Sequence, residues 1–362
     1  MCKPTAKGPN SKYKIYKKDH QEESLIPKLA RMIGPNSKYK VYTTEQDKSL
    51  IPTLAVSLWL GWMGLLTYAI IFAVTLATPF QRKVIISILA ISFILPPAFP
   101  GKLGNRIGLW IMKEAEKYFG LKVTLENEAA FHKLNEEGKS AIFAIEPHDF
   151  LPFGVFALNS GLGYLPGKIG ETSKALMTSA IFKLPIIKHI YTWVGGVPVD
   201  KKTFRSRLAN NQCVVFCPGG VQEVILIDPK NKDDLILFLQ SRKGFIKLAL
   251  ETGTAIVPTF IFNLDNSFGY LIPRGKFMSN IARKIGFLPV FFWGRFYIPF
   301  GIPNPVNISV VIGEPFEVPC EGTNISNESV DKYHKIFLQK TEELFERHKH
   351  AEGYGHRTLK IM

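Results

Sequence analysis

A cluster of ionisable side chains interrupts an apolar stretch in residues 141–159. The apolar residues 141–145 predict a strand, and residues 150–158 predict an apolar helix that follows it. Four residues stand between the two: Glu146, Pro147, His148 and Asp149. Burying ionisable groups is costly unless they are paired or face a cleft, so we expect them at the end of the strand, facing a cleft.

His148 is the candidate general base of this cluster, because an imidazole titrates near neutral pH. Pro147 fixes a backbone dihedral angle and limits the directions in which His148 points. The flanking carboxylates, Glu146 and Asp149, raise the basicity of an imidazole. A histidine beside a proline is about as often an ordinary hydrogen-bonded turn residue, so these residues alone leave the catalytic and the structural interpretations open.

The composition allows several kinds of partner. The chain has 362 residues, 46% of them hydrophobic, and 45 basic against 30 acidic side chains give a net charge of +15. Such a charge suits an anionic membrane surface, a phosphate-bearing ligand or nucleic acid, and does not choose between them. The four cysteines show no paired or zinc-ligand spacing, which favours a reduced, cytosol-facing protein.

The first fifty residues contain an internal duplication. The motif GPNSKYKIY at 8–16 recurs as GPNSKYKVY at 34–42, and SLIPKLA at 24–30 recurs as SLIPTLA at 49–55. Two polar copies are too few to stack into a solenoid. We expect a mobile basic arm over residues 1–52 that lies on anionic lipid head groups, although a duplication without function explains the pattern equally well.

A membrane segment is predicted after this arm. Residues 53–81 contain no charged side chain, and at about 1.5 Å per residue they exceed a hydrocarbon core of about 30 Å. Arg82 and Lys83 separate them from a second apolar run at 84–99. The pattern predicts a membrane-embedded helical hairpin over 53–101 that crosses twice or dips into one leaflet, with both of its ends in the cytosol.

The remaining residues, 102–362, alternate between helix and strand patterns. We expect helices at 103–119, 129–137, 242–251 and 329–348, and strands at 121–125, 212–217, 255–262 and 307–312. Alternation of this kind predicts an α/β fold with a mainly parallel or mixed sheet that is covered by helices on both faces. We expect this part of the chain to form a cytosolic domain.

Three further segments could carry chemistry, although each is weak alone. Residues 216–224 hold the pair Gly219 and Gly220, followed by Glu223, a pattern that is also common in hairpin turns. Basic side chains in the segments 195–205 and 242–260 could instead be ordinary solvated helix residues. They are Lys201, Arg205, Arg242 and Lys243.

The order of these segments resembles the type-2 diacylglycerol acyltransferase family. The blocks that carry the resemblance are EPH (146–148), YTWVGGVPVD (191–200), CPGGVQEV (217–224), RKGFIKLALETGTAIVPTFIF (242–262), FFWGRF (291–296), VVIGEPFEVP (310–319) and LFERHKHAEGYG (344–355). The resemblance covers residues 54–362 and leaves the duplicated arm unexplained. The Glu-Pro-His variant is similar to the plant and algal branch of the family.

The resemblance implies a glycerolipid-acyltransferase-like sheet and transfer of a fatty acyl group from acyl-CoA to the free hydroxyl of diacylglycerol, giving triacylglycerol. It implies that His148 is the general base, with acyl-CoA as co-substrate and with no metal or other cofactor. Backbone donors at Gly219 and Gly220, or at the helix start after His148, would stabilise the oxyanion. The reaction would take place on the cytosolic face of the endoplasmic reticulum, with lipid droplets as a second location.

The carboxylate that orients His148 is uncertain. The wider glycerolipid acyltransferase superfamily has an aspartate five residues after the histidine, where this chain has Phe153. We expect Glu223 to take this role, with Glu146 as the other candidate. Asp149 stands where the family usually has a small residue, and it would either tune the base or lie at the surface.

Several alternatives remain at this stage. The four basic residues named above could bind the phosphates of CoA. Monoacylglycerol or a fatty (wax) alcohol could replace diacylglycerol as the acceptor, and the chain could be an inactive lipid-droplet membrane protein. A serine hydrolase and a nucleic-acid-binding protein are disfavoured, because the sequence has neither a Gly-x-Ser-x-Gly elbow nor a nucleic-acid-binding motif. Acyl-chain preference and the formation of a homo-oligomer stay open.

Overall fold

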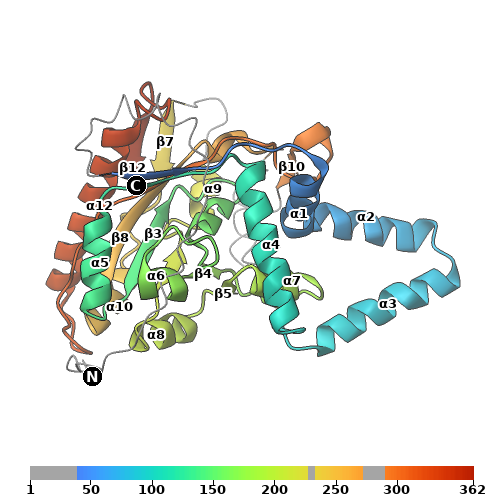
Figure 1. The fold of residues 1–362 in the computed structure, drawn as a ribbon, viewed down its shortest axis with the longest axis horizontal. Helices are drawn as coiled ribbons and strands as arrows, with labels where there is room; N and C mark the ends of the chain where they lie inside the picture. Colours follow the sequence, from blue (N-terminus) through green and yellow to red (C-terminus); the bar gives the residue numbers. More distant parts are fainter. Residues whose placement is uncertain (1–38, 227–232, 272–289) are drawn as a thin grey trace, which may run out of the picture.

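The structure is a computed structural model that describes residues 39–226, 233–271 and 290–362 (Figure 1). The first copy of the duplication lies outside these residues. The second copy of SLIPTLA, at 49–55, lies at the start of α1 (Leu50–Leu60). The second copy of the other motif, at 34–42, ends inside the described residues at β1 (Lys40–Thr43), which pairs antiparallel with β2 (Lys122–Leu125). This part of the predicted arm is therefore an edge strand of the main sheet.

One mixed sheet of eight strands organises the domain. From edge to edge the strands are β1, β2, β11 (Ser309–Ile312), β8 (Ala255–Phe262), β3 (Ala141–Glu146), β6 (Val214–Phe216), β4 (Lys174–Met177) and β5 (Gly196–Pro198). The five strands from β8 to β5 run parallel to one another, and β11 runs antiparallel to β8. The carboxyl ends of these parallel strands meet at one edge of the sheet, where ligands bind in open α/β sheets.

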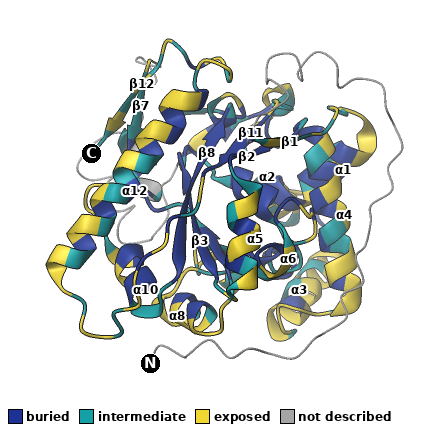
Figure 2. Ribbon diagram, turned by 60° about the vertical axis from the view of Figure 1, so that its left-hand side comes forward, coloured by how far each residue is buried: buried dark blue, intermediate teal, exposed yellow. Residues whose placement is uncertain are grey.

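Helices cover both faces of the sheet, as predicted (Figure 2). One face packs against α4 (Lys102–Tyr118), α5 (Glu128–Glu136) and α7 (Ile187–Trp193), and the other against α8 (Lys201–Ala209), α10 (Gly244–Thr252) and α12 (Asn327–His348). Successive residues of β3 alternate between the two cores: Phe143 and Ile145 belong to the first, Ile142 and Ala144 to the second. Every residue of β3 and β8 is buried, because apolar runs suit strands that are covered on both sides.

The long uncharged run is broken into two helices, a break that the hydropathy pattern does not mark. Helices α1 (Leu50–Leu60) and α2 (Trp62–Thr75) meet at a bend of 76°. A side chain at Gly61 would lie 2.6 Å from the Ser57 carbonyl oxygen and 2.9 Å from Ile302. Within the described residues no single helix is long and apolar enough to cross a bilayer, and this bent pair would qualify by length and composition alone.

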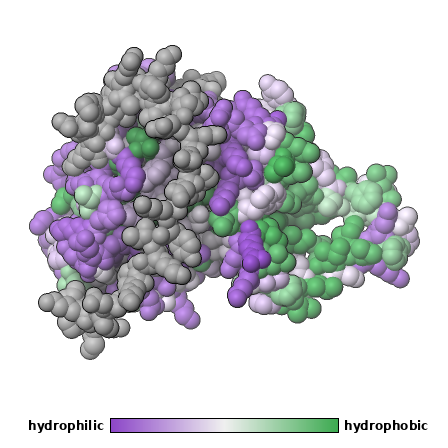
Figure 3. Space-filling view, viewed as in Figure 1, coloured by the Kyte–Doolittle hydropathy of each residue, from purple (hydrophilic) through white to green (hydrophobic). Residues whose placement is uncertain are grey.

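Helix α1 belongs to the packed domain, whereas α2 and α3 (Pro79–Ile94) project from it (Figure 1). Trp59 of α1 is buried in the first core. The projecting helices instead expose large apolar side chains, which form the hydrophobic arm seen in Figure 3. At its tip, Thr78 and Gln81 form a capping box, and Arg82 donates to the Val74 carbonyl oxygen.

Helix α7 fixes the exit of this hairpin to the domain. Lys188 donates to the Phe93 carbonyl oxygen over 2.8 Å, and Trp193 Nε1 donates to the Phe99 carbonyl oxygen over 2.9 Å. The ring nitrogens of His189 lie 3.0 and 3.1 Å from carbonyl oxygens of the same segment. These contacts satisfy backbone acceptors where α3 ends, so the hairpin is tied to the domain at both of its ends.

The cysteines only partly follow the prediction of reduced thiols. Cys213 and Cys217 are free, and they flank β6 on its two sides. Cys320 is disulfide-bonded, so the prediction is wrong at this residue.

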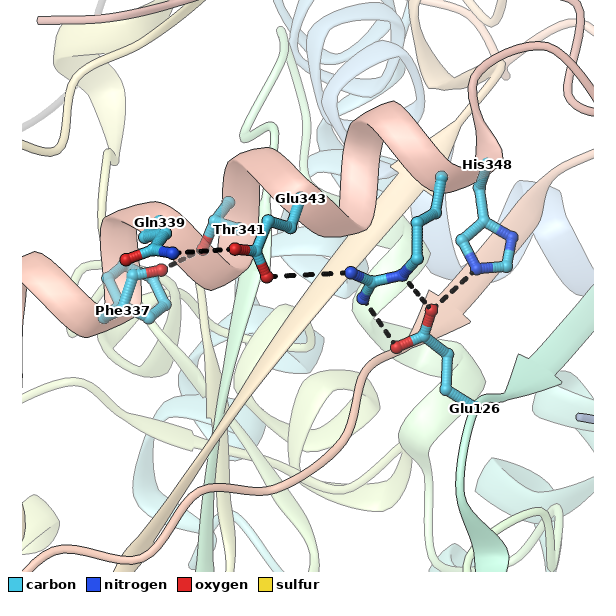
Figure 4. Close-up of polar contacts among 7 residues, drawn as sticks. Glu126, Phe337, Gln339, Thr341, Glu343 and His348 are labelled. Atoms are coloured by element: carbon cyan, nitrogen blue, oxygen red, sulfur yellow. Dashed lines mark hydrogen bonds and ion pairs between the residues drawn. The ribbon is translucent and has the colours of Figure 1, made fainter. Parts of the chain in front are cut away.

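Glu126 ties the carboxyl end of α12 to β2 (Figure 4). Its buried carboxylate accepts two hydrogen bonds of 2.9 Å from Arg347 and lies 2.9 Å from His348 Nε2. Burial raises the pKa of Glu126, but the hydrogen bonds from His348 and Arg347 outweigh it and hold the pKa below the ordinary value. The ionised carboxylate therefore stabilises the fold.

We predict that Glu126→Gln lowers the free energy of unfolding at pH 7 by about 1–2 kcal/mol, because Arg347 is 43% exposed and solvent screens part of the contact. Stability linked to a lowered carboxyl pKa is present above the unfolded pKa and is lost as the pH falls through the folded pKa. The difference should thus shrink below about pH 4.5. Glu343→Gln removes a longer pair of 3.8 Å with the same arginine and is the control. Denaturant unfolding that shows equal losses for both variants would contradict the prediction.

Candidate active site

The polar turn lies at the carboxyl end of the central strand, as predicted. Glu146 ends β3, the Glu146–Pro147 peptide bond is cis, and Asp149 adopts a left-handed conformation with φ of 47°. The helix predicted over 150–158 is shorter, because regular structure resumes only as a 3-10 helix, η1 (Phe153–Leu158), after Pro152. A left-handed residue and a proline are both incompatible with continuing an α-helix here.

His148 is held at its backbone and at one ring nitrogen. Its N–H donates to Glu223 Oε2 over 2.8 Å, and its Nδ1 lies 2.8 Å from the Asp149 carbonyl oxygen. A carbonyl oxygen only accepts, so Nδ1 carries the proton and Nε2 keeps the lone pair. Although the residue is partly exposed, the burial of its ring lowers the pKa of His148 to about 4. The imidazole is consequently neutral at pH 7, with Nε2 able to accept a proton.

Glu223 supports the turn rather than the ring. It lies on α9 (Val221–Leu226), is 1% exposed, and uses one oxygen for the His148 N–H and the other for the Phe238 N–H, which is 2.9 Å away. We expected Glu223 to orient the imidazole of His148, but the hydrogen bond between the two residues is made by the main-chain N–H of His148. The imidazole Nδ1 donates to the Asp149 carbonyl oxygen instead.

Glu146 and Gly219 complete the buried side of the turn. Glu146 is 0% exposed, and its Oε1 accepts the Gly219 N–H over 3.0 Å. A side chain on Gly219 would begin 1.8 Å from Glu223 Oε1, so only glycine allows this approach. Gly220 has φ of 60° and open space beside it. Because the Gly219 N–H already has an acceptor, an oxyanion would need other donors, such as Gly220.

Asp149 faces a second polar cluster, which the sequence analysis did not predict. Asp265, just after β8, accepts hydrogen bonds of 2.6 Å from Tyr354 Oη and from Arg357 Nη2. Burial and the charge of Asp265 raise the pKa of Asp149 to about 7. Asp149 is thus buried, and is not a surface residue. Tyr354 lies in the last block of the family resemblance, which was the available signal for this cluster.

Aromatic side chains form the apolar side of the turn. Phe150 packs against Phe268, Tyr270 and Phe292, with ring centroids 4.8–5.5 Å apart. Phe153, five residues after His148, is buried 4.8 Å from the Phe119 ring. The position that carries an aspartate in the wider superfamily is therefore part of an apolar wall.

Of the four predicted phosphate-binding residues, Arg242 comes near the turn. Its Nη2 donates to the Gly219 carbonyl oxygen over 3.1 Å. Arg205 is paired with Glu251 at 2.9 Å, and Lys243 with Asp331 at 2.7 Å. Lys201 is exposed at the first turn of α8. The contacts of these last three side chains do not connect them to His148.

Comparison with known proteins identifies the family. A family model described as diacylglycerol acyltransferase matches residues 79–361, which is more than half of the chain. The chain belongs to the diacylglycerol acyltransferase family.

Individual relatives agree with this family. Diacylglycerol O-acyltransferase 1 of Eremothecium gossypii is 33% identical over 238 residues, 62% of this chain and half the length of that protein. Diacylglycerol O-acyltransferase 2-like protein 6 of Bos taurus is 27% identical over 332 residues, 84% of this chain and 94% of the relative. The solved 1-acyl-sn-glycerophosphate acyltransferase PlsC of Thermotoga maritima is 16% identical, with a TM-score of 0.37 over 81% of this chain and 97% of that one. This last similarity is too low for a comparison of the two sites.

Gly219→Ala should lower acyltransferase activity by about 100-fold, because its methyl group collides with Glu223 and displaces the His148 turn. Gly220→Asn is the matched control. Asparagine tolerates the left-handed conformation, its Cβ meets no neighbour and the main-chain N–H of residue 220 is kept, so its activity should stay within about threefold of wild type. Activity of membranes that contain equal amounts of each protein checks this, and equal losses in both variants would show that the contact with Glu223 is unimportant.

Proposed function

We propose that the protein transfers a fatty acyl group from acyl-CoA to the free hydroxyl of diacylglycerol, with His148 as the general base. The observation that carries this proposal is the contact between His148 Nδ1 and the Asp149 carbonyl oxygen, which leaves the lone pair of the ring on Nε2. Burial lowers the pKa of His148 to about 4, so the ring is able to accept a proton at pH 7. Membership of the diacylglycerol acyltransferase family supports the donor and the acceptor. The Glu-Pro-His motif supports the plant and algal branch.

The proposed reaction needs one proton acceptor. The acceptor hydroxyl gives its proton to His148 Nε2 as its oxygen attacks the thioester carbonyl carbon. The tetrahedral intermediate then expels the CoA sulfur, and the imidazolium returns the proton to the departing thiolate. The Asp149 carbonyl oxygen accepts from Nδ1 throughout and favours the transient positive charge. No covalent enzyme intermediate forms along this route.

Diacylglycerol is a membrane lipid, and the projecting hairpin supports its delivery from a bilayer. Side chains along α2 and α3, among them Ile70, Phe80 and Ile86, are more than half exposed. Such a surface is unfavourable in water and suits hydrocarbon. We propose that this hairpin inserts into the endoplasmic reticulum membrane, or into the surface of a lipid droplet, from the cytosolic side. Arg242 is the basic residue best placed to meet the phosphates of CoA.

Microsomes from a host that lacks its own triacylglycerol synthesis test the proposal. They are given labelled acyl-CoA with diacylglycerol, monoacylglycerol or a long-chain alcohol. We expect labelled triacylglycerol from wild type, and about 1,000-fold less or none from His148→Ala, since loss of a general base costs about 10²–10⁴-fold. Label in another acceptor would change the substrate but keep the mechanism. No label with any acceptor would favour an inactive lipid-droplet membrane protein.

The pH dependence tests the role of His148 separately. Since its pKa is lowered to about 4, kcat/KM should persist at pH 5.5, where an imidazole with the usual pKa of about 6.5 would be largely protonated. Ionisation of Asp149 should add an inflection near pH 7, which Asp149→Asn removes. Rates measured from pH 4 to 9 for both proteins check this. Half-loss at about pH 6.5 in both proteins would contradict the assignment.

A further inference from the structure

We propose that Glu146 is a positioning residue that holds a proton at neutral pH and donates it in a hydrogen bond to the carboxylate of Glu223. This inference rests on the proposed function of His148, because the pair supports the turn that carries His148. It explains how the turn is held in place. It assigns a protonation state to Glu146, which contacts neither ring nitrogen of His148 in the described structure.

The first observation is an oxygen without a donor. Glu146 ends the central strand and is completely buried. Its Oε1 accepts the Gly219 N–H, whereas Oε2 is buried and has no hydrogen-bond partner among the described residues. A buried carboxylate oxygen without a donor is strongly unfavourable, but the same oxygen becomes a donor when it carries a proton.

The second observation is that both oxygens of Glu223 already accept hydrogen bonds that favour its charge, and each can accept one more. Each of its oxygens accepts one backbone N–H, from His148 and from Phe238. Gly219 lies directly against the Glu223 carboxyl group and donates its N–H to Glu146, so the carboxyl groups of Glu146 and Glu223 both lie next to Gly219. They are within hydrogen-bonding reach of each other. A proton shared by the pair consequently belongs on Glu146.

The charged groups around Glu146 and Glu223 favour one bound proton on this pair of carboxyl groups. Within the described part of the chain, the ionisable groups that interact with Glu146 are Glu223, the guanidinium of Arg242 and the thiol of Cys217. Arg242 donates to the Gly219 carbonyl oxygen, and burial raises the pKa of the Cys217 thiol. Among the residues that the structure describes, two ionised carboxylates would face one cation, Arg242, which hydrogen-bonds to neither of them. Burial and the charge of Glu223 accordingly raise the pKa of Glu146 well above its ordinary value.

The shared proton has a geometric consequence. A protonated Glu146 connects the Gly219 turn, through Glu223, to the backbone of His148. Glutamine at position 146 offers the same acceptor and a permanent donor, whereas alanine offers neither. The proposal therefore predicts that Glu146→Gln keeps acyltransferase activity and that Glu146→Ala loses it.

The kinetic test compares Glu146→Gln with Glu146→Ala in the microsomal assay. Glu146→Gln should keep at least about one third of the wild-type kcat, and Glu146→Ala should lower kcat by about 100-fold with a similar KM, as expected for a displaced base. Glu146→Gln should also remove the loss of thermal stability that wild type shows as the pH rises from about 4.5, the ordinary pKa of a glutamate, towards the raised pKa of Glu146. Equal loss of kcat in both variants would overturn the proposal, because it would mean that an ionised carboxylate is required.

A spectroscopic test needs neither activity nor the alanine variant. Infrared spectra of the purified full-length protein at neutral pH should show carbonyl bands of protonated carboxyl groups, and Glu146→Gln should remove one band that Asp149→Asn leaves in place. Asp149→Asn is the matched control, because Asp149 is the other buried acid beside His148 with a raised pKa near 7. A spectrum unchanged by Glu146→Gln would overturn the inference. Failure of wild type to transfer acyl groups would overturn the proposed function and leave this result standing.

Discussion

The hydrogen bond from the His148 N–H to Glu223 Oε2, 2.8 Å long, joins the turn after β3 to helix α9. The other parts of the turn depend on it. Gly219 must lack a side chain because the Glu223 carboxyl group occupies that space. The fixed backbone of His148 and Asp149 in turn brings the Asp149 carbonyl oxygen to Nδ1, which sets the tautomer of the ring.

The C-terminal residues support this turn from the opposite side. Glu223 takes its second hydrogen bond from Phe238, which directly follows β7 (Asp234–Leu237). Strand β7 pairs in parallel with β12 (Thr358–Ile361), close to the end of the chain. The same segment provides Tyr354 and Arg357, which bind Asp265 near Asp149. Residues far from the motif in sequence therefore set both its geometry and its electrostatics.

These separations along the chain explain which features could be predicted from the sequence. The central strand, the polar turn and the Gly-Gly block were predicted because apolar runs, prolines and glycines mark them locally. The link between Asp265 and Arg357 spans 92 residues and leaves no local pattern. The sequence also indicated Glu223 as the partner of His148, but not which atom it binds. That choice depends on the left-handed conformation of Asp149, which turns its carbonyl oxygen toward the ring.

The break between α1 and α2 at Gly61 could not be predicted from the sequence for a different reason. The residues on both sides are equally apolar, so hydropathy does not distinguish α1, which is buried against the domain, from α2, which is exposed. Packing makes the distinction: Trp59 lies against Phe153 and Phe156 of η1, with ring centroids 6.4 and 5.6 Å apart.

This packing has a consequence for a lipid substrate. Helix η1 begins five residues after His148, so the base of the hairpin touches the element that follows the proposed catalytic turn. The exit of the hairpin is fixed as well, through Lys188 and Trp193 of α7. A hairpin held at both ends cannot rotate freely against the domain. If it inserts as proposed, the plane of the membrane therefore also sets the direction from which an acceptor lipid approaches His148.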